Sequence, residues 1–170
     1  MNWTIKSILD ATKDYFQSKK IETPRIDAEI LLAYALNYKN RLNLYLDFDK
    51  LLTNSEFSLY RDLVKKRIKH IPCQYIVQES AFFGVPFFVN NHVLIPRPET
   101  ELLVEKCIRM IKETDAQVGL DVGIGSGVIC CSLKMQIPSL SILGLDISLP
   151  AVHVAKKNFQ NLINVNESVF

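Results

Sequence analysis

One short stretch of the chain, residues 118–128, restricts the possible folds more than any other. It reads Val-Gly-Leu-Asp-Val-Gly-Ile-Gly-Ser-Gly-Val, an apolar run with an acid followed by three glycines at alternate positions. Residues 128–135 then read as the start of a helix. The order strand, tight turn, helix presents backbone N–H groups and a helix N-terminus to a ligand. Because glycine has no Cβ, such a turn can adopt positive φ and let a ligand approach closely.

The spacing of the glycines distinguishes between classes of ligand. A dinucleotide fingerprint, G-x-G-x-x-G, would need a glycine at position 128, where this chain has valine. The order Asp-x-Gly-x-Gly-x-Gly at residues 121–127 instead resembles the first motif of S-adenosylmethionine-dependent methyltransferases. A second apolar run, residues 141–145, ends at Asp146, and an acid there can accept hydrogen bonds from ribose hydroxyls. The alternative is a plain strand–turn–helix unit whose glycines serve close packing.

The composition excludes several other classes of protein. Net charge is only +2, so nothing in it calls for a nucleic-acid or membrane partner. The four cysteines form no C-x-x-C pair and the three histidines are scattered, so we expect reduced thiols and no metal site. Charged residues near the N-terminus argue against a signal peptide, and no apolar run is long enough to span a bilayer. We therefore expect a cytoplasmic protein.

The first 72 residues predict a small helical bundle. Apolar residues recur at helical spacing, Thr23-Pro24 marks one helix start, and Thr53-Asn54-Ser55-Glu56 has the form of a capping box. Pro72 follows the last helix and ends it. We expect helices at residues 3–18, 25–36, 41–46 and 53–70.

The fourth of these helices has a basic face. Either this face contacts an acidic partner or RNA, or it is simply solvated. The near-neutral charge of the whole chain favours a solvated face. The basic residues are Arg61, Lys65, Lys66, Arg67 and Lys69.

After residue 72 the pattern becomes β-like. Residues 75–77 are β-like, and two phenylalanine-rich runs at 82–83 and 87–89, separated by Gly84-Val85-Pro86, predict a β-hairpin. Two prolines then hold residues 94–98 extended, and acids occupy the first turn of a helix that runs to about residue 113.

Taken together, five motifs resemble one family. In order along the chain they are similar to the N-terminal part of the PrmC/HemK family, the peptide chain release factor glutamine methyltransferases. The segment 94–101 is the most specific, because other methyltransferases share the glycine turn. The motifs are Arg25-Ile26-Asp27-Ala28-Glu29, Arg67…Pro72…Tyr75, Leu94-Ile95-Pro96-Arg97-Pro98-Glu99-Thr100-Glu101, residues 121–127, and Asp146-Ile147-Ser148 with Ala155…Asn158.

The resemblance implies an α/β chain with an N-terminal α-helical bundle, a β-hairpin linker, and the first part of a doubly wound, Rossmann-like methyltransferase domain. The corresponding ranges are residues 1–72, 73–98 and 99–170. It implies methyl transfer from S-adenosylmethionine to the side-chain nitrogen of the glutamine in the Gly-Gly-Gln motif of class-one release factors. The bundle would help bind the release factor. We expect a monomer with no direct nucleic-acid contact and no membrane contact.

The resemblance also implies roles for particular residues. Arg97, Pro98 and Glu99 would lie near the active site as a partial cover, or alternatively form only a rigid connector at a helix start. Two positions depart from the family, Ile124 in place of threonine and Gln78 in place of glycine. The expected cofactor-binding residues are Asp121, Gly123, Ile124, Gly125, Ser126, Gly127 and Asp146.

One family motif does not occur in this chain. An Asn-Pro-Pro-Tyr sequence at the end of the fourth strand would orient the weakly nucleophilic amide of the substrate. Without it, no side chain can be assigned a catalytic role, and we expect this chain alone to be inactive. Only about 55 residues follow the start of the first strand, whereas a parallel sheet must be covered on both faces. We therefore expect a C-terminally truncated family member.

Two other functions remain open. The chain could be a non-catalytic release-factor-binding module, or a nucleic-acid amino-methyltransferase that shares the cofactor turn. The segment 94–101 favours the protein substrate over the nucleic acid.

Overall fold

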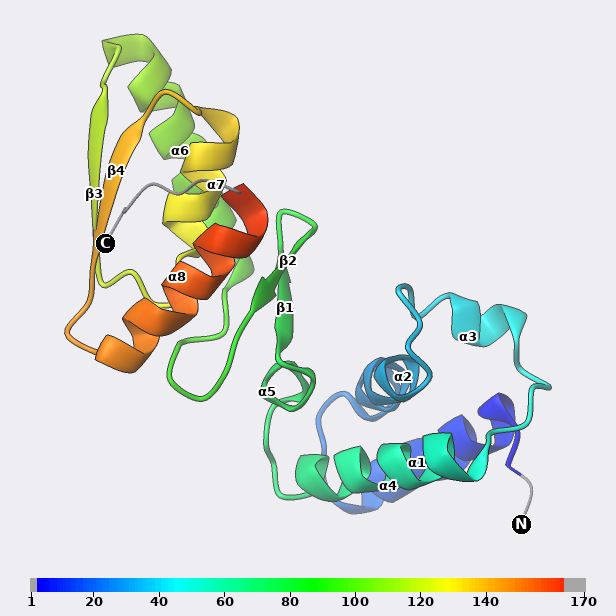
Figure 1. Cartoon of the computed structure of the whole chain (residues 1–170). Helices are drawn as coiled ribbons and strands as arrows, with labels where there is room; N and C mark the ends of the chain where they lie inside the picture. Colours follow the sequence, from blue (N-terminus) through cyan, green and yellow to red (C-terminus); the bar gives the residue numbers. More distant parts are fainter. Residues whose placement is uncertain (1–2, 164–170) are drawn as a thin grey trace. The chain divides into compact units, whose positions relative to one another are not determined.

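The computed structural model describes residues 3–163, and their contacts divide the chain into two compact units (Figure 1). The first unit ends at Val77 and the second begins at Gln78. The division falls later than the expected boundary after residue 72, because residues 73–77 pack within the first unit. Residues 164–170 of the expected third domain lie outside the described residues.

The first unit is entirely helical among its described residues, apart from one isolated β-bridge between Thr4 and Leu51. Capping boxes at Thr4 and Thr53 start its first and fourth helices. Apolar residues from several helices, including Leu9, Phe16 and Leu31, are fully buried in one core. The four predicted helices are confirmed. The helices are α1 (Ile5–Ser18), α2 (Pro24–Ala35), α3 (Asn43–Leu46), α4 (Asn54–Arg67) and α5 (Cys73–Val77).

The β structure predicted at residues 75–77 is wrong. This segment belongs to helix α5, in which Cys73 and Ile76 are buried against α2 and α4. The N–H groups of Tyr75 and Ile76 donate to the carbonyl of Pro72, each at 3.1 Å, and begin the helix. Three consecutive apolar residues fit a strand and a buried helical turn equally well, so their pattern could not separate the two.

The basic face of α4 is partly internal. The Arg67 Nε atom donates to Asp27 Oδ2 at 2.7 Å, and both side chains are largely buried. Lys65 pairs with Asp62 at 2.9 Å on the surface. Arg67 therefore stabilises the bundle and is not part of a free basic surface.

The second unit contains two small sheets and three longer helices among its described residues. Strands β1 (Glu79–Phe82) and β2 (Val85–Phe88) form the antiparallel hairpin that the sequence predicted. Strands β3 (Val118–Val122) and β4 (Ser141–Leu145) pair in parallel, with Val118 opposite Ser141 and Val122 opposite Leu145. The helices are α6 (Pro98–Thr114), α7 (Val128–Gln136) and α8 (Leu149–Ile163).

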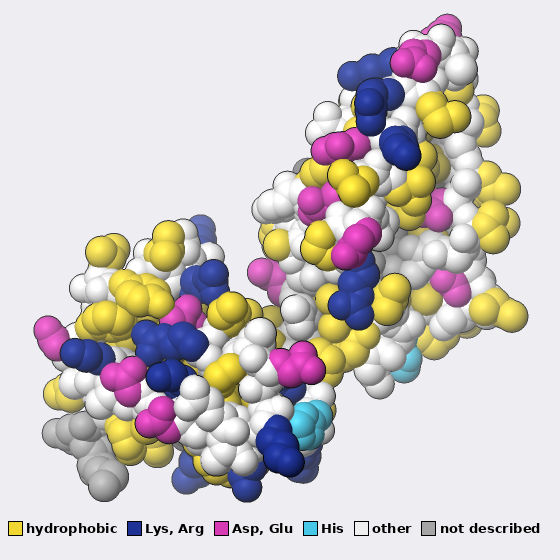
Figure 2. Space-filling view, turned by 180° about the vertical axis from the view of Figure 1, so that it is seen from behind, with side chains coloured by type: hydrophobic (Ala, Val, Ile, Leu, Met, Phe, Trp, Pro, Cys, Tyr) yellow, Lys and Arg dark blue, Asp and Glu magenta, His cyan; other side chains and the backbone are white. Residues whose placement is uncertain are grey.

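All three helices lie on one side of the β3–β4 sheet (Figure 1). Alternate residues of the strands, such as Gly119 and Ile142, face the helices. On the other face the apolar side chains are exposed, with Val118, Leu120 and Val122 exposed by 76%, 60% and 77%. Hydrophobic side chains accordingly project along the margin of this unit (Figure 2). Within residues 3–163, none of the helices has the length and apolar character needed to cross a bilayer.

Candidate functional site

The glycine turn lies between the end of β3 and the start of α7. Gly123, Gly125 and Gly127 have φ values of +84°, +54° and +80°, which a residue with a Cβ adopts only with strain. Among the described residues, a Cβ added to Gly123 would meet no atom within 4 Å, and one on Gly125 would meet only a backbone oxygen at 3.9 Å. The backbone of the turn is therefore open on those sides to an approaching group.

Four backbone N–H groups of the turn already donate hydrogen bonds to acceptors within the protein. They tie the turn to the end of β4 and close it on itself. The expectation that these N–H groups face a ligand is therefore wrong for all four. The bonds run from Gly123 and Ile124 to Leu145 O (2.8 and 2.9 Å), from Gly125 to Asp146 Oδ2 (2.9 Å), and from Gly127 to Ile124 O (2.8 Å).

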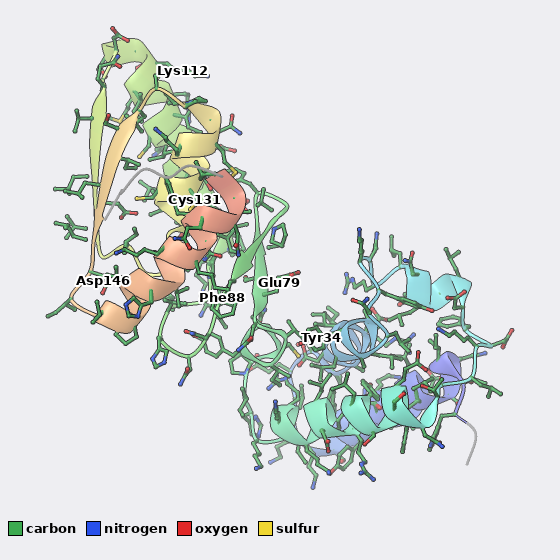
Figure 3. The ribbon with its side chains drawn as sticks, in the orientation of Figure 1. Tyr34, Glu79, Phe88, Lys112, Cys131 and Asp146 are labelled. Atoms are coloured by element: carbon green, nitrogen blue, oxygen red, sulfur yellow. The ribbon has the colours of Figure 1, made fainter. Side chains whose placement is uncertain are left out.

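Asp146 follows β4 directly and is held in a fixed position (Figure 3). Its Oδ1 accepts the N–H of Ser148 at 2.9 Å, and its Oδ2 accepts the N–H of Gly125 at the same distance. These bonds, that from Ser148 first, hold the pKa of the Asp146 carboxyl below its usual value. The carboxylate is ionised at neutral pH and partly exposed. Each oxygen has a second acceptor position, so the group can bind a pair of neighbouring hydroxyls.

Asp121 has different surroundings. It is half-buried on the helix side of β3, where the Cys130 thiol on α7 donates to its Oδ2 at 3.4 Å. Burial raises the pKa of Asp121, and the bond from Cys130 opposes that rise. Burial, followed by the charge of Asp121, raises the pKa of Cys130. Sequence reasoning gave Cys130 no role, because only the packing of α7 on β3 brings these residues together.

Ile124 contributes packing at this site. Its side chain is only 4% exposed, and a Cβ added to Gly144 in β4 would lie 2.1 Å from Ile124 Cδ1. The isoleucine thus occupies the space left by the missing side chain of Gly144.

The structure does not join the linker residues to the glycine turn. Arg97, Pro98 and Glu99 are exposed at the start of α6, where Arg97 is the N-cap and Pro98 the first helical residue. Among residues 3–163, no hydrogen bond or ion pair connects these three to residues 123–127. The nearby Glu101 instead accepts the N–H of Phe83 at 2.7 Å and ties α6 to the hairpin.

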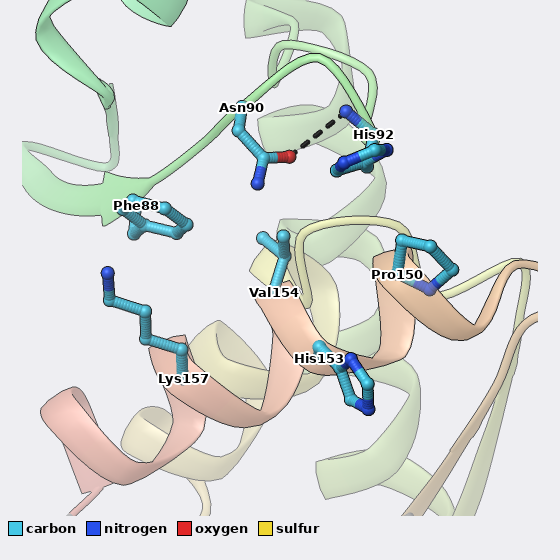
Figure 4. A pocket seen from close by; sticks show the side chains of 7 residues that line it. All are labelled: Phe88, Asn90, His92, Pro150, His153, Val154 and Lys157. Atoms are coloured by element: carbon cyan, nitrogen blue, oxygen red, sulfur yellow. Dashed lines mark hydrogen bonds between the residues drawn. The ribbon is translucent and has the colours of Figure 1, made fainter.

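Described residues of the second unit form at least two cavities, and residues 123–127 line neither of these two. One of about 310 Å³ separates the end of β2 from α8, and Asn90, His92, His153 and Lys157 are among its lining residues (Figure 4). The other, of about 370 Å³, is mainly apolar and lies between α6, β3 and α7. The second of these cavities is lined in part by Asp121, and Asp146 lines neither of them.

The residues present fit an adenosyl group. Asp146 offers fixed carboxylate acceptors for two ribose hydroxyls, beside a turn whose backbone is open at Gly123 and Gly125. The described residues contain no group of His, Cys, Asp and Glu side chains that could hold a metal ion.

Comparison with known families divides the chain into two parts that resemble its two compact units. Residues 7–77 match the model described as the PrmC N-terminal domain, and residues 98–168 match the methyltransferase small domain. The first match ends at the boundary between the two compact units.

Several curated proteins are similar to the chain over almost its whole length. A protein named release factor glutamine methyltransferase from Chlorobaculum tepidum is 39% identical over 161 residues, covering 92% of this chain and 54% of the relative. One of the same name from Leptospira interrogans is 43% identical over 156 residues, covering 91% and 54%. A bifunctional methyltransferase from Rickettsia felis is 32% identical over 185 residues, covering 93% and 35%. The chain spans about half the length of the first two relatives.

Proposed function

We propose that the chain belongs to the PrmC/HemK family of release factor glutamine methyltransferases and carries two parts of that activity. The second unit binds S-adenosylmethionine, and the helical first unit docks a class-one peptide chain release factor. The observation that carries the proposal is the Asp146 carboxylate, held by the Gly125 N–H beside an open glycine turn. The compartment that suits this role is the cytoplasm, and we propose a monomer.

The proposed cofactor contacts follow from the geometry of the site. Asp146 accepts the ribose hydroxyls, while Gly123 and Gly125 let the cofactor approach the backbone. When bound, S-adenosylmethionine supplies an electrophilic methyl group on a sulfonium. Asp121, Ile124, Ser126 and Gly127 hold the shape of the turn through their contacts with α7, β4 and α8.

The exposed start of α6 is proposed as part of the substrate side. Arg97 and Glu99 are solvent-accessible there, and Pro98 fixes the direction in which the helix begins. Exposed charges of both signs suit contact with a protein better than contact with a polyanion.

We propose that this chain alone does not transfer the methyl group. An amide nitrogen is a poor nucleophile, because its lone pair is delocalised into the carbonyl, so transfer depends on acceptors that orient it. The sequence contains no Asn-Pro-Pro-Tyr motif, and no described side chain has been assigned this orienting role.

The proposal is tested with the 170-residue chain and a bacterial class-one release factor. Calorimetric titration is expected to show binding of the release factor, and incubation with tritiated S-adenosylmethionine is expected to label no glutamine. A release factor that fails to bind would end the docking role. Label in the Gly-Gly-Gln glutamine would show that the chain carries its own orienting groups.

A further inference from the structure

One buried asparagine on α8 joins two distant parts of the second unit. The side chain of Asn158 is 1% exposed, and its amide makes three hydrogen bonds. Its Oδ1 accepts the N–H of Phe88 at 2.7 Å, and its Nδ2 donates to the carbonyls of Phe88 at 2.9 Å and Ser126 at 2.8 Å. The partners are 70 and 32 residues away along the chain. Asn158 therefore connects the end of β2 to the glycine turn.

The bond to Ser126 fixes one peptide plane of the turn. The Ser126 carbonyl accepts from Asn158, while the N–H at the other end of the same peptide, that of Gly127, donates to Ile124 O at 2.8 Å. Gly127 can adopt φ of either sign at little cost, so the glycines alone do not select one orientation of this plane. The amide of Asn158 and the hydrogen bond from Gly127 to Ile124 together supply that selection.

Two other residues of α8 contact the same two parts of the chain, the glycine turn and β2. A Cβ on Gly127 would lie 3.1 Å from the Cβ of Ala155, so the helix packs directly on the turn. The Lys157 ammonium lies 3.4 Å from the centre of the Phe88 ring, and both residues are visible in Figure 4. Helix α8 thus contacts the turn and β2 through residues on one side.

We propose that Asn158 is a positioning residue for the cofactor site. It sets the orientation of the peptides around Ser126 and anchors the end of β2, from which the chain continues to segment 94–99, exposed at Leu94 and at residues 97–99. The identity of the ligand rests on the proposed function, whereas the positioning of the turn does not. Only an amide of this length offers one acceptor and two donors here, because aspartate lacks the donors and glutamine is longer by one methylene.

The test compares two asparagines of the same helix. Asn158→Asp replaces the donors toward two carbonyls by a carboxylate, and Asn161→Asp makes the same chemical change at an exposed position. In chains that retain native circular dichroism, Asn158→Asp is expected to weaken S-adenosylmethionine binding at least tenfold. It is also expected to accelerate amide hydrogen exchange at Gly127 by a similar factor, whereas the Phe88 N–H keeps a carboxylate acceptor. Asn161→Asp is expected to change neither quantity.

A second measurement on the unsubstituted chain decides the matter if Asn158→Asp does not fold. The side-chain amide signals of Asn158 should shift when S-adenosylmethionine is added, while those of Asn161 should not. Wild-type affinity and exchange in folded Asn158→Asp would overturn the proposal, as would unmoved Asn158 signals in a saturated complex. If the unsubstituted chain binds no S-adenosylmethionine, the proposed function fails, and the exchange rate at Gly127 still tests the positioning.

Discussion

The carboxyl groups of Asp121, near the end of β3, and Asp146, just after β4, have opposite surroundings. Burial raises the pKa of Asp121, whereas backbone hydrogen bonds lower that of Asp146. The sequence placed both carboxylates correctly at strand ends but did not distinguish their roles. That difference depends on which face of the strand each side chain occupies, and on donors that come from other elements.

Acid titration should reveal the bonds to Asp146. A carboxyl with a lowered pKa in the folded state contributes stability above its unfolded pKa and loses it as pH falls through the folded value. Asp146→Asn should therefore flatten the loss of unfolding free energy that occurs below about pH 4, the usual carboxyl range. Urea unfolding of both chains at a series of pH values measures this, and identical acid slopes would contradict the assignment.

The buried pair between Arg67 and Asp27 should matter more than the surface pair between Lys65 and Asp62. Asp27→Ala leaves the Arg67 guanidinium largely buried without its carboxylate, which costs about 3 kcal/mol. Asp62→Ala removes an exposed partner and should produce no measurable change. Urea unfolding monitored by far-UV circular dichroism compares the two variants. Equal losses in both would show that burial of the Arg67 pair does not govern its contribution.

At the scale of elements, local signals predicted most of the helices and the hairpin. The capping box at Thr53 and the prolines at the starts of α2 and α6 define helix starts from neighbouring residues alone. The short helix α5 was missed, because its burial against α2 and α4 depends on tertiary packing. The acceptors that the N–H groups of the glycine turn find in Leu145 and Asp146 were unpredictable for the same reason. Leu145 ends β4 and Asp146 follows it, so both come from another part of the chain.

The contact between the glycine turn and β4 predicts a specific coupling. Gly144→Ala would place its Cβ against Ile124 and should destabilise the second unit by about 1–3 kcal/mol, as overpacking usually does. Shortening Ile124 to alanine in the same chain vacates that space, so the double variant should lose less stability than the sum of the single losses. A double-mutant cycle by urea unfolding measures the coupling. Strict additivity would show that the two residues do not compete for this space.

At the scale of the whole molecule, the exposed sheet face is the main departure from ordinary globular packing. Parallel sheets are covered on both faces, yet the described helices cover only one face of β3 and β4. The curated relatives are about twice as long as the part that this chain matches.

Although we propose a monomer in dilute solution, the exposed face should make the 170-residue chain self-associate at high protein concentration. Leu120 and Val122 project from it, so replacing both with threonine should reduce the sedimentation-detected oligomers and the binding of a hydrophobic dye. The free energy of unfolding should change little, because neither side chain contributes to the core. The matched change of buried Val104 to threonine should lower stability instead. Unchanged association in the Leu120, Val122 variant would place the association surface elsewhere.

The central claim is that the glycine turn and Asp146 together bind S-adenosylmethionine. Calorimetric titration of the 170-residue chain tests it most directly, with Asp146→Ala and the exposed control Asp62→Ala measured alongside. Saturable binding is expected in the unsubstituted chain and in the control, with a loss of at least tenfold in Asp146→Ala, since a fixed acceptor for the ribose is removed. Equal affinity in all three chains, or no binding in any, would contradict the account.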